Sequence, residues 1–376
     1  MQTPFHVPFY DEDDARAVSS AVRSGKLVGD GPATKQASAF LASLLHVNHV
    51  LLTTSCTHAL ELAMMTLNLQ PDDEVIVPSF TFVSSTNAIL RQRARPVFAD
   101  IRPDTLTLGA TEVRTHLTGR TRAIMPIVYA GVSADVDPIM ALAAARNIVV
   151  VEDAAQGIGA GYRGRPAGTT GHMGCFSFHE TKNFSTGEGG AFVTNDDELM
   201  TKAEIVREKG TNRKQFLLGL VDKYTWVDTG SSFLPPDSMA ALLMSQLSKR
   251  DLIQRRRKEI FERYTGEFAR LADQGNLMLP VIPDYAASNY HIFHVLLESE
   301  TVRNRAIAFF REHDIGTTFH YLPLHLSPVG RRIGYTEGDF PVTESVSGRL
   351  LRLPIYPSLT DDAVAHVIRT MNEFFA

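Results

Sequence analysis

A single lysine, Lys182, stands in a pattern that could make it a reactive amine. The residues from Cys175 to Phe178 are apolar enough for a short buried strand, and those from Gly189 to Thr194 predict a second one. Lys182 is therefore expected on a loop held between two buried elements. Burial and nearby cations lower the pKa of a lysine ammonium, and the neutral amine is a nucleophile. On these residues alone, an ordinary solvent-exposed loop lysine is the alternative.

The neighbours of Lys182 favour the reactive lysine. Phe176-Ser-Phe-His-Glu-Thr-Lys-Asn183, followed by Gly187-Glu-Gly-Gly190, resembles the lysine motif of the DegT/DnrJ/EryC1/StrS sugar aminotransferases, and the resemblance extends over nearly all 376 residues. These enzymes use pyridoxal 5'-phosphate, have the aspartate-aminotransferase fold (fold type I) and aminate nucleotide-linked keto sugars. The resemblance implies that Lys182 is the catalytic lysine. It also implies that His179, three residues earlier, assists proton transfer or contacts substrate.

The elements that must position Lys182 alternate between strands and helices. Short apolar runs at 49–54, 74–78, 96–100, 122–128 and 147–153 predict strands, and helical segments separate them. This alternation favours an α/β fold with a large, mostly parallel, doubly wound sheet. Ligands of such sheets bind beyond the carboxyl ends of the strands. The candidates that fall at those ends are Ser55, Phe82, Asp153 and Ser177.

Two of these strand ends could hold an anion and an aromatic ring. The strand at 49–54 runs directly into a helix, and a helix N-terminus attracts anions through free backbone N–H groups and its dipole, although Ser55 could be a simple helix cap. The resemblance implies that Ser55, Cys56 and Thr57 hold the cofactor phosphate. It also implies that Phe82 stacks on the pyridine ring, whereas a core phenylalanine is the ordinary alternative.

Asp153 ends the most apolar strand of the chain, where a lone aspartate requires a partner. A helix cap or a structural ion pair would satisfy it. In the family, an aspartate here keeps the pyridine nitrogen protonated, because an opposite charge at short range favours the charged form, and a protonated ring withdraws electrons. The resemblance further implies that Gln156 reaches the ring hydroxyl and that Ser177 bonds the phosphate.

Several further segments narrow the resemblance to one subgroup. They include Lys26-Leu-Val-Gly-Asp-Gly31, Arg207-Glu-Lys-Gly-Thr-Asn-Arg213 and Gly230-Ser-Ser-Phe-Leu234. The subgroup is the dTDP-4-amino-4,6-dideoxygalactose transaminases of enterobacterial common antigen synthesis, which implies dTDP-4-keto-6-deoxyglucose as acceptor and glutamate as donor. Most of the wider family has asparagine and arginine where this chain has Ser232 and Leu234. That asparagine reaches the cofactor phosphate of the other subunit of a homodimer.

Other activities remain open at this stage. Amination at C3 of the sugar, or a product with gluco configuration, is a close alternative. Relatives that dehydrate sugars carry histidine in place of Lys182. A non-catalytic, regulatory protein on the same fold is an alternative of a different class, although no added DNA-binding segment is visible.

Substrate contacts are expected from two places. In the family, the glycine-rich segment around Lys26 borders the active site, and a His-Tyr segment like that at His320, Tyr321 and His325 lies nearby. Histidines at this spacing could ligate a metal, but no third or fourth ligand is evident, so we expect none.

Length and composition bound the remaining possibilities. A chain of 376 residues predicts two domains, here 1–245 for the large cofactor-binding domain and 246–376 for a smaller C-terminal α/β domain, with a long helix from Met239 to about Leu271 joining them. The net charge of −5 argues against a nucleic-acid surface. With two cysteines, no signal peptide and no membrane-spanning run, we expect a cytoplasmic protein without nucleic-acid or membrane partners.

Overall fold

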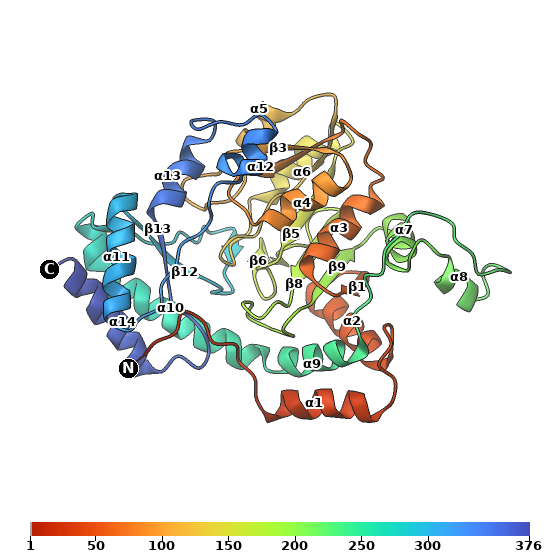
Figure 1. Ribbon diagram of the computed structural model, residues 1–376, viewed down its shortest axis with the longest axis horizontal. Coiled ribbons are helices and arrows are strands. Elements are labelled where there is room, and N and C mark those ends of the chain that lie inside the picture. The colour runs from red at the N-terminus through yellow and green to blue at the C-terminus, as the bar shows by residue number, and fades with distance from the viewer. Residues whose placement is uncertain (1) are drawn as a thin grey trace.

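The computed structural model describes residues 2–376, and a seven-stranded sheet forms its centre (Figure 1). The strand order is β1-β9-β8-β5-β4-β2-β3, in which β9 pairs antiparallel with both neighbours and the other pairs are parallel. The mostly parallel α/β fold predicted from the sequence is confirmed. The strands are β1 (His49–Thr53), β2 (Glu74–Pro78), β3 (Arg95–Ala99), β4 (Thr121–Ile124), β5 (Val149–Ala154), β8 (Met173–Ser177) and β9 (Gly190–Thr194).

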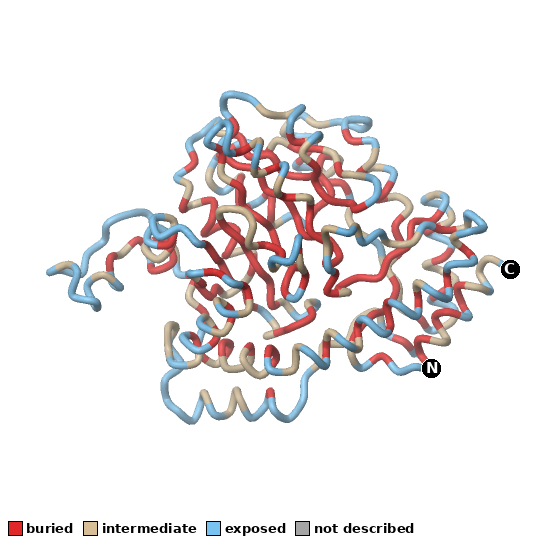
Figure 2. Tube along the Cα trace, turned by 180° about the vertical axis from the view of Figure 1, so that it is seen from behind, coloured by how far each residue is buried: buried red, intermediate tan, exposed pale blue. Residues whose placement is uncertain are grey.

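Helices cover both faces of this sheet, which explains why its strands are apolar almost throughout. One face packs under α3, α4 and α7, and the other packs under α2 and α9 with α5 and α6 beside them. In Figure 2 the red, buried segments are concentrated at the centre of the molecule. These helices are α2 (Pro32–Leu45), α3 (Cys56–Thr66), α4 (Val83–Arg91), α5 (Ala110–His116), α6 (Val136–Ala144), α7 (Asp197–Arg207) and α9 (Asp237–Ser248). The short helix α8 (Arg213–Leu217) has no buried residue and does not pack on the sheet.

A second core lies around a three-stranded sheet in the C-terminal third, which we call the small domain. Its strand order is β10-β12-β13, and apolar side chains of α10, α11 and α14 pack on it. Residues 324–349 return to the large sheet, where Leu324 and Phe340 join its core. The elements are α10 (Arg250–Asp273), β10 (Leu277–Met278), β12 (Phe293–Leu297), α11 (Glu300–Glu312), η1 (Leu324–Leu326), α12 (Pro328–Arg332), α13 (Pro341–Arg349), β13 (Leu350–Leu353) and α14 (Asp361–Phe374).

Three local features differ from the sequence prediction. The single helix expected from Met239 to about Leu271 is two helices, because the chain turns at Lys249 between α9 and α10. Residues 316–320, which the sequence also predicts as a strand, form only one bridge, in which Thr318 and Arg352 exchange backbone hydrogen bonds. An unpredicted small sheet joins β6 (Gly161–Tyr162), β7 (Arg165–Pro166) and β11 (Ala286–Ala287).

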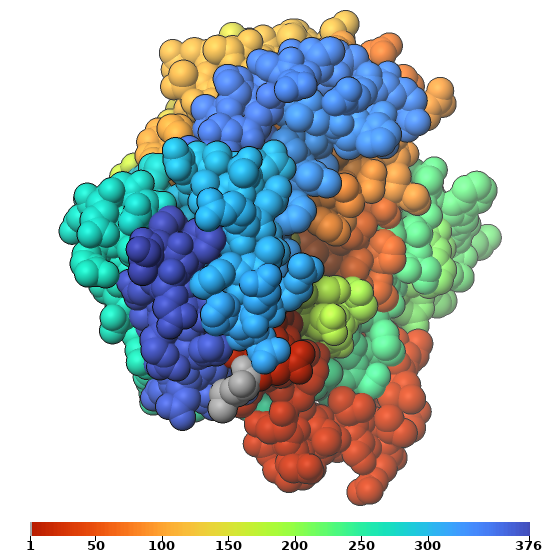
Figure 3. All heavy atoms as spheres, turned by 60° about the vertical axis from the view of Figure 1, so that its left-hand side comes forward, coloured from red at the N-terminus to blue at the C-terminus, as the bar shows by residue number. Residues whose placement is uncertain are grey.

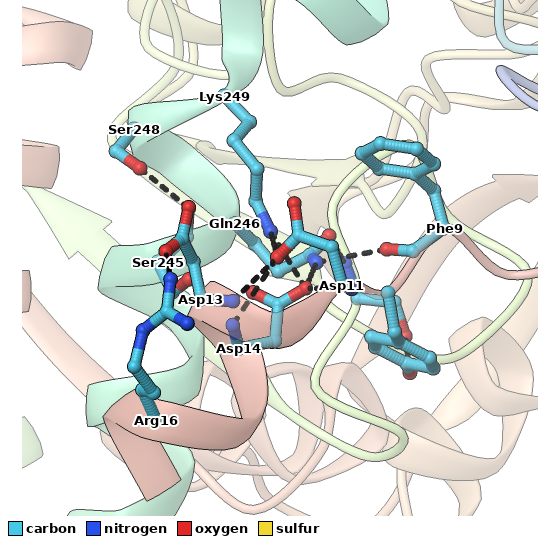
Figure 4. A network of polar contacts seen from close by, with 11 residues as sticks. Phe9, Asp11, Asp13, Asp14, Arg16, Ser245, Gln246, Ser248 and Lys249 are labelled. Carbon is cyan, nitrogen blue, oxygen red and sulfur yellow. Dashed lines mark hydrogen bonds and ion pairs between the residues drawn. The ribbon is translucent and has the colours of Figure 1, made fainter. Parts of the chain in front are cut away.

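The N-terminal helix α1 (Glu12–Arg23) lies along α9 and is attached by a buried polar network (Figure 4). The Lys249 ammonium lies 2.7 Å from an Asp11 oxygen and 2.6 Å from an Asp14 oxygen. Gln246 donates to the same Asp14 oxygen at 2.8 Å and to the carbonyl of Phe9 at 2.9 Å. The residues before α1 continue to the small domain, where Figure 3 shows the red N-terminal segment against the blue C-terminal third.

No helix within residues 2–376 combines the length and the apolar character that crossing a membrane requires.

Candidate active site

A cavity of about 350 Å³ lies beyond the carboxyl ends of the central strands, with walls from both domains. Its position is the one that a doubly wound sheet predicts for a ligand. Most residues singled out in the sequence line it. They are Ser55, Cys56, Thr57, Phe82, Asp153, Gln156, Ser177, His179, Lys182, His320 and Tyr321.

Lys182 lies on the loop between β8 and β9, with its side chain at the cavity wall. Its backbone N–H donates to the carbonyl of His179 at 2.9 Å, which closes a tight turn. Burial lowers the pKa of the Lys182 amine, and the Arg352 guanidinium acts in the same direction, whereas Cys56 and Asp153 oppose the shift. The structure therefore brings the amine closer to its neutral, nucleophilic form.

Asp153 lies at the end of β5, and its carboxylate is buried. Burial raises the pKa of Asp153, and two donors partly counteract this effect: the Ser85 hydroxyl at 2.6 Å and the backbone N–H of Ala155 at 3.1 Å. Within the described residues, Asp153 forms no ion pair, although the nearby Lys182 charge favours its ionised form. A buried carboxylate in this state is suited to a cationic or N–H partner supplied by a ligand.

The N-terminus of α3 also lines the cavity and can bind an anion. Ser55 caps this 11-residue helix by accepting from the backbone of His58 at 3.1 Å. The free N–H groups of the first turn and the helix dipole lie at the cavity. A Cβ added to Gly190 would lie 2.4 Å from the backbone of Ser55 and 2.5 Å from that of Cys56, so β9 requires glycine for this close approach.

A series of side-chain contacts connects Gln156 with the small-domain wall of the cavity. Gln156 accepts from the backbone of Ala130 at 2.7 Å and donates to the Tyr321 hydroxyl at 3.2 Å. The rings of Tyr321 and His320 stack, with their centroids 4.1 Å apart. His320 is neutral in this setting, because burial and the Arg352 charge lower its pKa to about 2.

His179 and Phe82 border the cavity where it meets solvent. His179 contacts the Thr181 hydroxyl at 3.0 Å and lies 3.6 Å from a carboxylate oxygen of Glu188. Phe82 is 58% exposed, and its ring centroid lies 6.5 Å from that of Tyr321. Because Phe82 is largely exposed, it is not a core residue. Its ring lines the cavity and is accessible to an aromatic ligand.

Three predicted site residues lie elsewhere in this chain. Lys26 is exposed after α1, and Ser232 is exposed beside Glu208, with which it forms a β-bridge. His325 is fully buried between the Ser79 hydroxyl at 2.7 Å and a Glu344 oxygen at 2.9 Å. These two contacts occupy both ring nitrogens, so His325 links the returning segment to β2 and does not line the cavity.

Sequence reasoning missed several residues that the fold brings to the cavity. Arg352 stands inside the apolar strand β13, and a charge within such a run was a usable signal. Arg257 lies in a basic stretch of α10 that looks like an exposed helix face, so its burial could not be read from the sequence. Others include Phe5, His6, Ser84 and His291. Residues 2–376 contain no cluster of three side chains suited to a metal ion.

Comparison with known proteins assigns the chain to a family. The chain is 33% identical to the spore coat polysaccharide biosynthesis protein SpsC of Bacillus subtilis, over 98% of this chain and 96% of SpsC. It is 32% identical to a pleiotropic regulatory protein of Geobacillus stearothermophilus, over 96% and 94% of the two chains. Spr1654 of Streptococcus pneumoniae, a candidate sugar aminotransferase, superposes in its PLP form with a TM-score of 0.91 and 27% identity, covering 100% of this chain and 98% of Spr1654.

Spr1654 has also been solved in a PMP form, the aminated state of the same cofactor. Pyridoxal 5'-phosphate is the cofactor of these proteins, and the cavity offers an anion cradle, a buried carboxylate and a lysine of lowered pKa. The model of the DegT/DnrJ/EryC1/StrS aminotransferase family matches residues 8–372, and the chain belongs to this family.

Proposed function

We propose that this aminotransferase moves the amino group of glutamate to C4 of dTDP-4-keto-6-deoxyglucose, giving dTDP-4-amino-4,6-dideoxygalactose and 2-oxoglutarate. The observation that carries the transaminase assignment is the position of Lys182, with its lowered pKa, in one cavity with the buried Asp153. The sugar assignment rests on the segments around Lys26, Arg207 and Gly230, which resemble those of the corresponding subgroup.

The cavity residues fit pyridoxal phosphate by the chemistry of their donors. The N-terminus of α3 and the Ser177 hydroxyl would hold the phosphate, and Phe82 would cover the ring. Asp153 would face the ring nitrogen and keep it protonated, while Gln156 would bond the ring hydroxyl. When bound, the cofactor supplies an aldehyde that takes up the amino group and a ring that withdraws electrons from the reacting carbon.

Lys182 has two tasks in this scheme. Its amine would hold the cofactor aldehyde in the resting enzyme. With the amino donor bound, the free amine would take the proton from Cα of glutamate and return it during the transfer, and it would serve the acceptor half-reaction in the reverse direction. Burial suits this role, since an amine with a lowered pKa is a usable base near neutral pH.

The neutral side chains of His320 and Tyr321 would line the sugar side of the cavity. Tyr321 accepts a hydrogen bond from Gln156, and His320 stacks on Tyr321. Neither carries charge at neutral pH, since burial lowers the pKa of His320 and raises that of Tyr321 to about 12. Neutral hydrogen-bonding groups suit the hydroxyl groups of a sugar ring. His179, at the mouth, is placed to contact the substrate or assist proton transfer.

We also propose that the protein works as a homodimer. The segment around α8 projects from the body of the molecule (Figure 1), and its apolar side chains are unusually exposed, including Leu220 at 71% and Trp226 at 76%. Exposed apolar surface of this kind is typical of an interface. Ser232 follows this segment, so a partner subunit could bring it to the cofactor of the other chain, and Lys26 could reach substrate in the same way.

A regulatory role is the second candidate, because the Geobacillus relative is named as a regulatory protein. The intact set of Lys182, Asp153 and Gln156 favours an enzyme, since a purely regulatory protein would have no use for a lysine of lowered pKa in the cavity.

The test is a complete reaction with purified protein, pyridoxal phosphate, glutamate and dTDP-4-keto-6-deoxyglucose, with the product identified by mass and by NMR. We expect a 4-amino sugar with the galacto configuration. Lys182→Ala should give no product while retaining its fold by circular dichroism. A gluco product or amination at C3 would move the assignment to a related aminotransferase. Failure to form 2-oxoglutarate from glutamate with any keto sugar would favour the regulatory role.

A further inference from the structure

His291 borders the same space as Lys182, and the proposed reaction gives it no task. It lies between β11 and β12, it is buried, and it lines the main cavity. A second cavity, of about 10 Å³, is lined by both His291 and Lys182. The two side chains are therefore neighbours, although they come from segments more than a hundred residues apart.

The hydrogen bonds of Asn183 determine which nitrogen of His291 carries the proton. The amide nitrogen of Asn183 donates to the backbone carbonyl of Asn289 at 2.9 Å, because a carbonyl can only accept. The amide oxygen of Asn183 therefore faces Nδ1 of His291, at 2.8 Å, and this oxygen also can only accept. His291 must carry a proton on Nδ1, so Nε2 of the neutral ring has a free lone pair.

The ring of His291 is neutral, and its Nε2 can be reached from the cavity. Burial, together with the charges of Lys182, Arg257 and Arg352, lowers the pKa of His291 well below its usual value. Nε2 makes no hydrogen bond within residues 2–376, yet it is not one of the fully enclosed polar atoms that lack a partner. It is therefore an unused acceptor at the surface of the cavity.

The backbone beside His291 is held in an uncommon conformation. Tyr290 has a φ of 55°, a left-handed value that bulky residues rarely adopt. The N–H of Tyr290 donates to the Ser288 hydroxyl at 2.9 Å, and the N–H of His291 donates to the side-chain oxygen of Asn289 at 3.1 Å. The amide nitrogen of Asn289 also donates to the carbonyl of Gln156 at 2.8 Å. Strain of this kind persists only where the surrounding structure maintains it, and it is frequent at active sites.

We propose that His291 is a positioning residue for Lys182, whose free amine donates a hydrogen bond to Nε2 of the imidazole. This inference rests on the proposed role of Lys182 and adds the residue that orients it. The contact is strongest when the amine has taken up a proton and is an ammonium. Because His291 is a weak base in its buried position, the proton stays on Lys182. His291 thus orients the amine without competing for the proton that the amine must return.

The other ionisable groups near the amine do not offer a comparable acceptor. They are Asp153, Cys56 and Arg352. Asp153 would face the ring nitrogen of the cofactor. Burial raises the pKa of the Cys56 thiol well above its usual value, and a thiol is a weak acceptor. The Arg352 guanidinium has no acceptor and repels an ammonium.

The test follows the Lys182 amine itself. Full-length, cofactor-free protein is labelled at lysine Cε for NMR, and the Lys182 signal is identified by its loss in Lys182→Ala. An acceptor stabilises the ammonium, so losing it lowers the pKa of the amine. His291→Asn keeps a donor for Asn183 near the place of Nδ1 and removes the acceptor, so the Lys182 titration should move to lower pH. His291→Gln places an amide oxygen near the position of Nε2 and should restore the titration toward that of the wild type.

His294→Asn is the matched control. His294 is a buried histidine on β12 whose pKa is lowered by burial to about 3, but it lines neither of the cavities that border Lys182. This variant should leave the Lys182 titration unchanged. In the loaded enzyme, His291→Asn should lower kcat about tenfold, the loss expected for one hydrogen bond to a charged group. The KM for glutamate should stay within about twofold, because the contact is made by the amine and not by the donor.

Two results would overturn the inference. An unchanged Lys182 titration in His291→Asn would show that Nε2 does not bind the amine, and a raised KM for the keto sugar in that variant would assign Nε2 to a substrate hydroxyl instead. A shift that His291→Gln does not reverse would show that His291 acts only through the fold. The titration needs no substrate, so the proposed reaction is tested separately: if the titrations behave as expected but no keto sugar is aminated, the positioning role stands and the proposed function fails.

Discussion

Removing the Ser85 hydroxyl tests how the protein keeps Asp153 ionised. Both side chains are buried, and the hydroxyl donates to the carboxylate at 2.6 Å. A hydrogen bond to a charged group contributes about 1.5–3 kcal/mol, and the same bond to a neutral carboxyl contributes about 1 kcal/mol. Ser85→Ala should therefore lower the free energy of unfolding at neutral pH by about 2 kcal/mol and raise the pKa of Asp153 further.

The pH dependence gives the sign of this effect. Burial already holds the pKa of Asp153 above 3.8, its ordinary value, so the folded state binds a proton more tightly than the unfolded state. Stability is then lost as pH rises from 3.8 through the folded-state pKa. Because that pKa is higher in Ser85→Ala, the loss continues to higher pH. The difference in free energy of unfolding between the wild type and Ser85→Ala should be largest near neutral pH and smallest below pH 3.8.

Urea unfolding of the cofactor-free protein across this pH range measures the effect directly. In the loaded enzyme, the acid limb of the pH–rate profile with glutamate should move to higher pH. Thr86→Val is the matched control, since the buried Thr86 hydroxyl has no partner among the described residues. If Ser85→Ala and Thr86→Val behaved alike, or if the stability difference did not depend on pH, the hydroxyl would not be tuning Asp153.

Three further predictions follow from other contacts. Gly190→Ala should weaken binding of pyridoxal phosphate at least tenfold, measured by equilibrium dialysis, because the new methyl group displaces the backbone at Cys56; unchanged binding would refute the cradle. Lys249→Met should lower the free energy of unfolding by about 3 kcal/mol, measured in urea, because Asp14 keeps a buried charge without its cation; a loss below 1 kcal/mol would contradict this. Leu220→Asp should shift the sedimenting species from dimer to monomer, and an unchanged dimer would place the interface elsewhere.

The central sheet was predictable because its signal is local. A strand buried on both faces is apolar throughout, and β5 shows this from Val149 to Val151 before the polar Glu152 and Asp153. Because the strands are parallel, their carboxyl ends lie along the same edge of the sheet. For this reason Asp153 and Ser177 could be placed near one another from the sequence.

The small-domain wall of the cavity was harder to predict, because it depends on contacts between distant segments. Arg257 and Arg352 are 95 residues apart in sequence (352 − 257), and the cavity acquires both through the packing of α10 against the sheet that contains β13. For His325 the error is the reverse: the sequence predicts it near the substrate, and the structure places it outside the cavity lining. Its spacing from His320 suggested a shared pocket, but the 3₁₀ turn η1 directs it toward Ser79. Whether Ser232 and Lys26 reach a site depends on a partner subunit, which no single-chain pattern can place.

The path of the N-terminal segment bears on how the two domains can move. Thr3 exchanges backbone hydrogen bonds with the small domain at Asp314 and Gly316, each at 2.8 Å, whereas α1 is attached through Asp14 to Lys249 at the end of α9. Residues 4–10 therefore cross between the domains beside the α9–α10 junction, and residues 324–349 leave the small domain for the large sheet before the chain returns at β13. The small domain is thus tied to the large one at several separate points, which restrains rotation about any single junction. Phe5 lies on one of these crossings and stacks on Arg352, so the N-terminal segment forms part of the cavity wall.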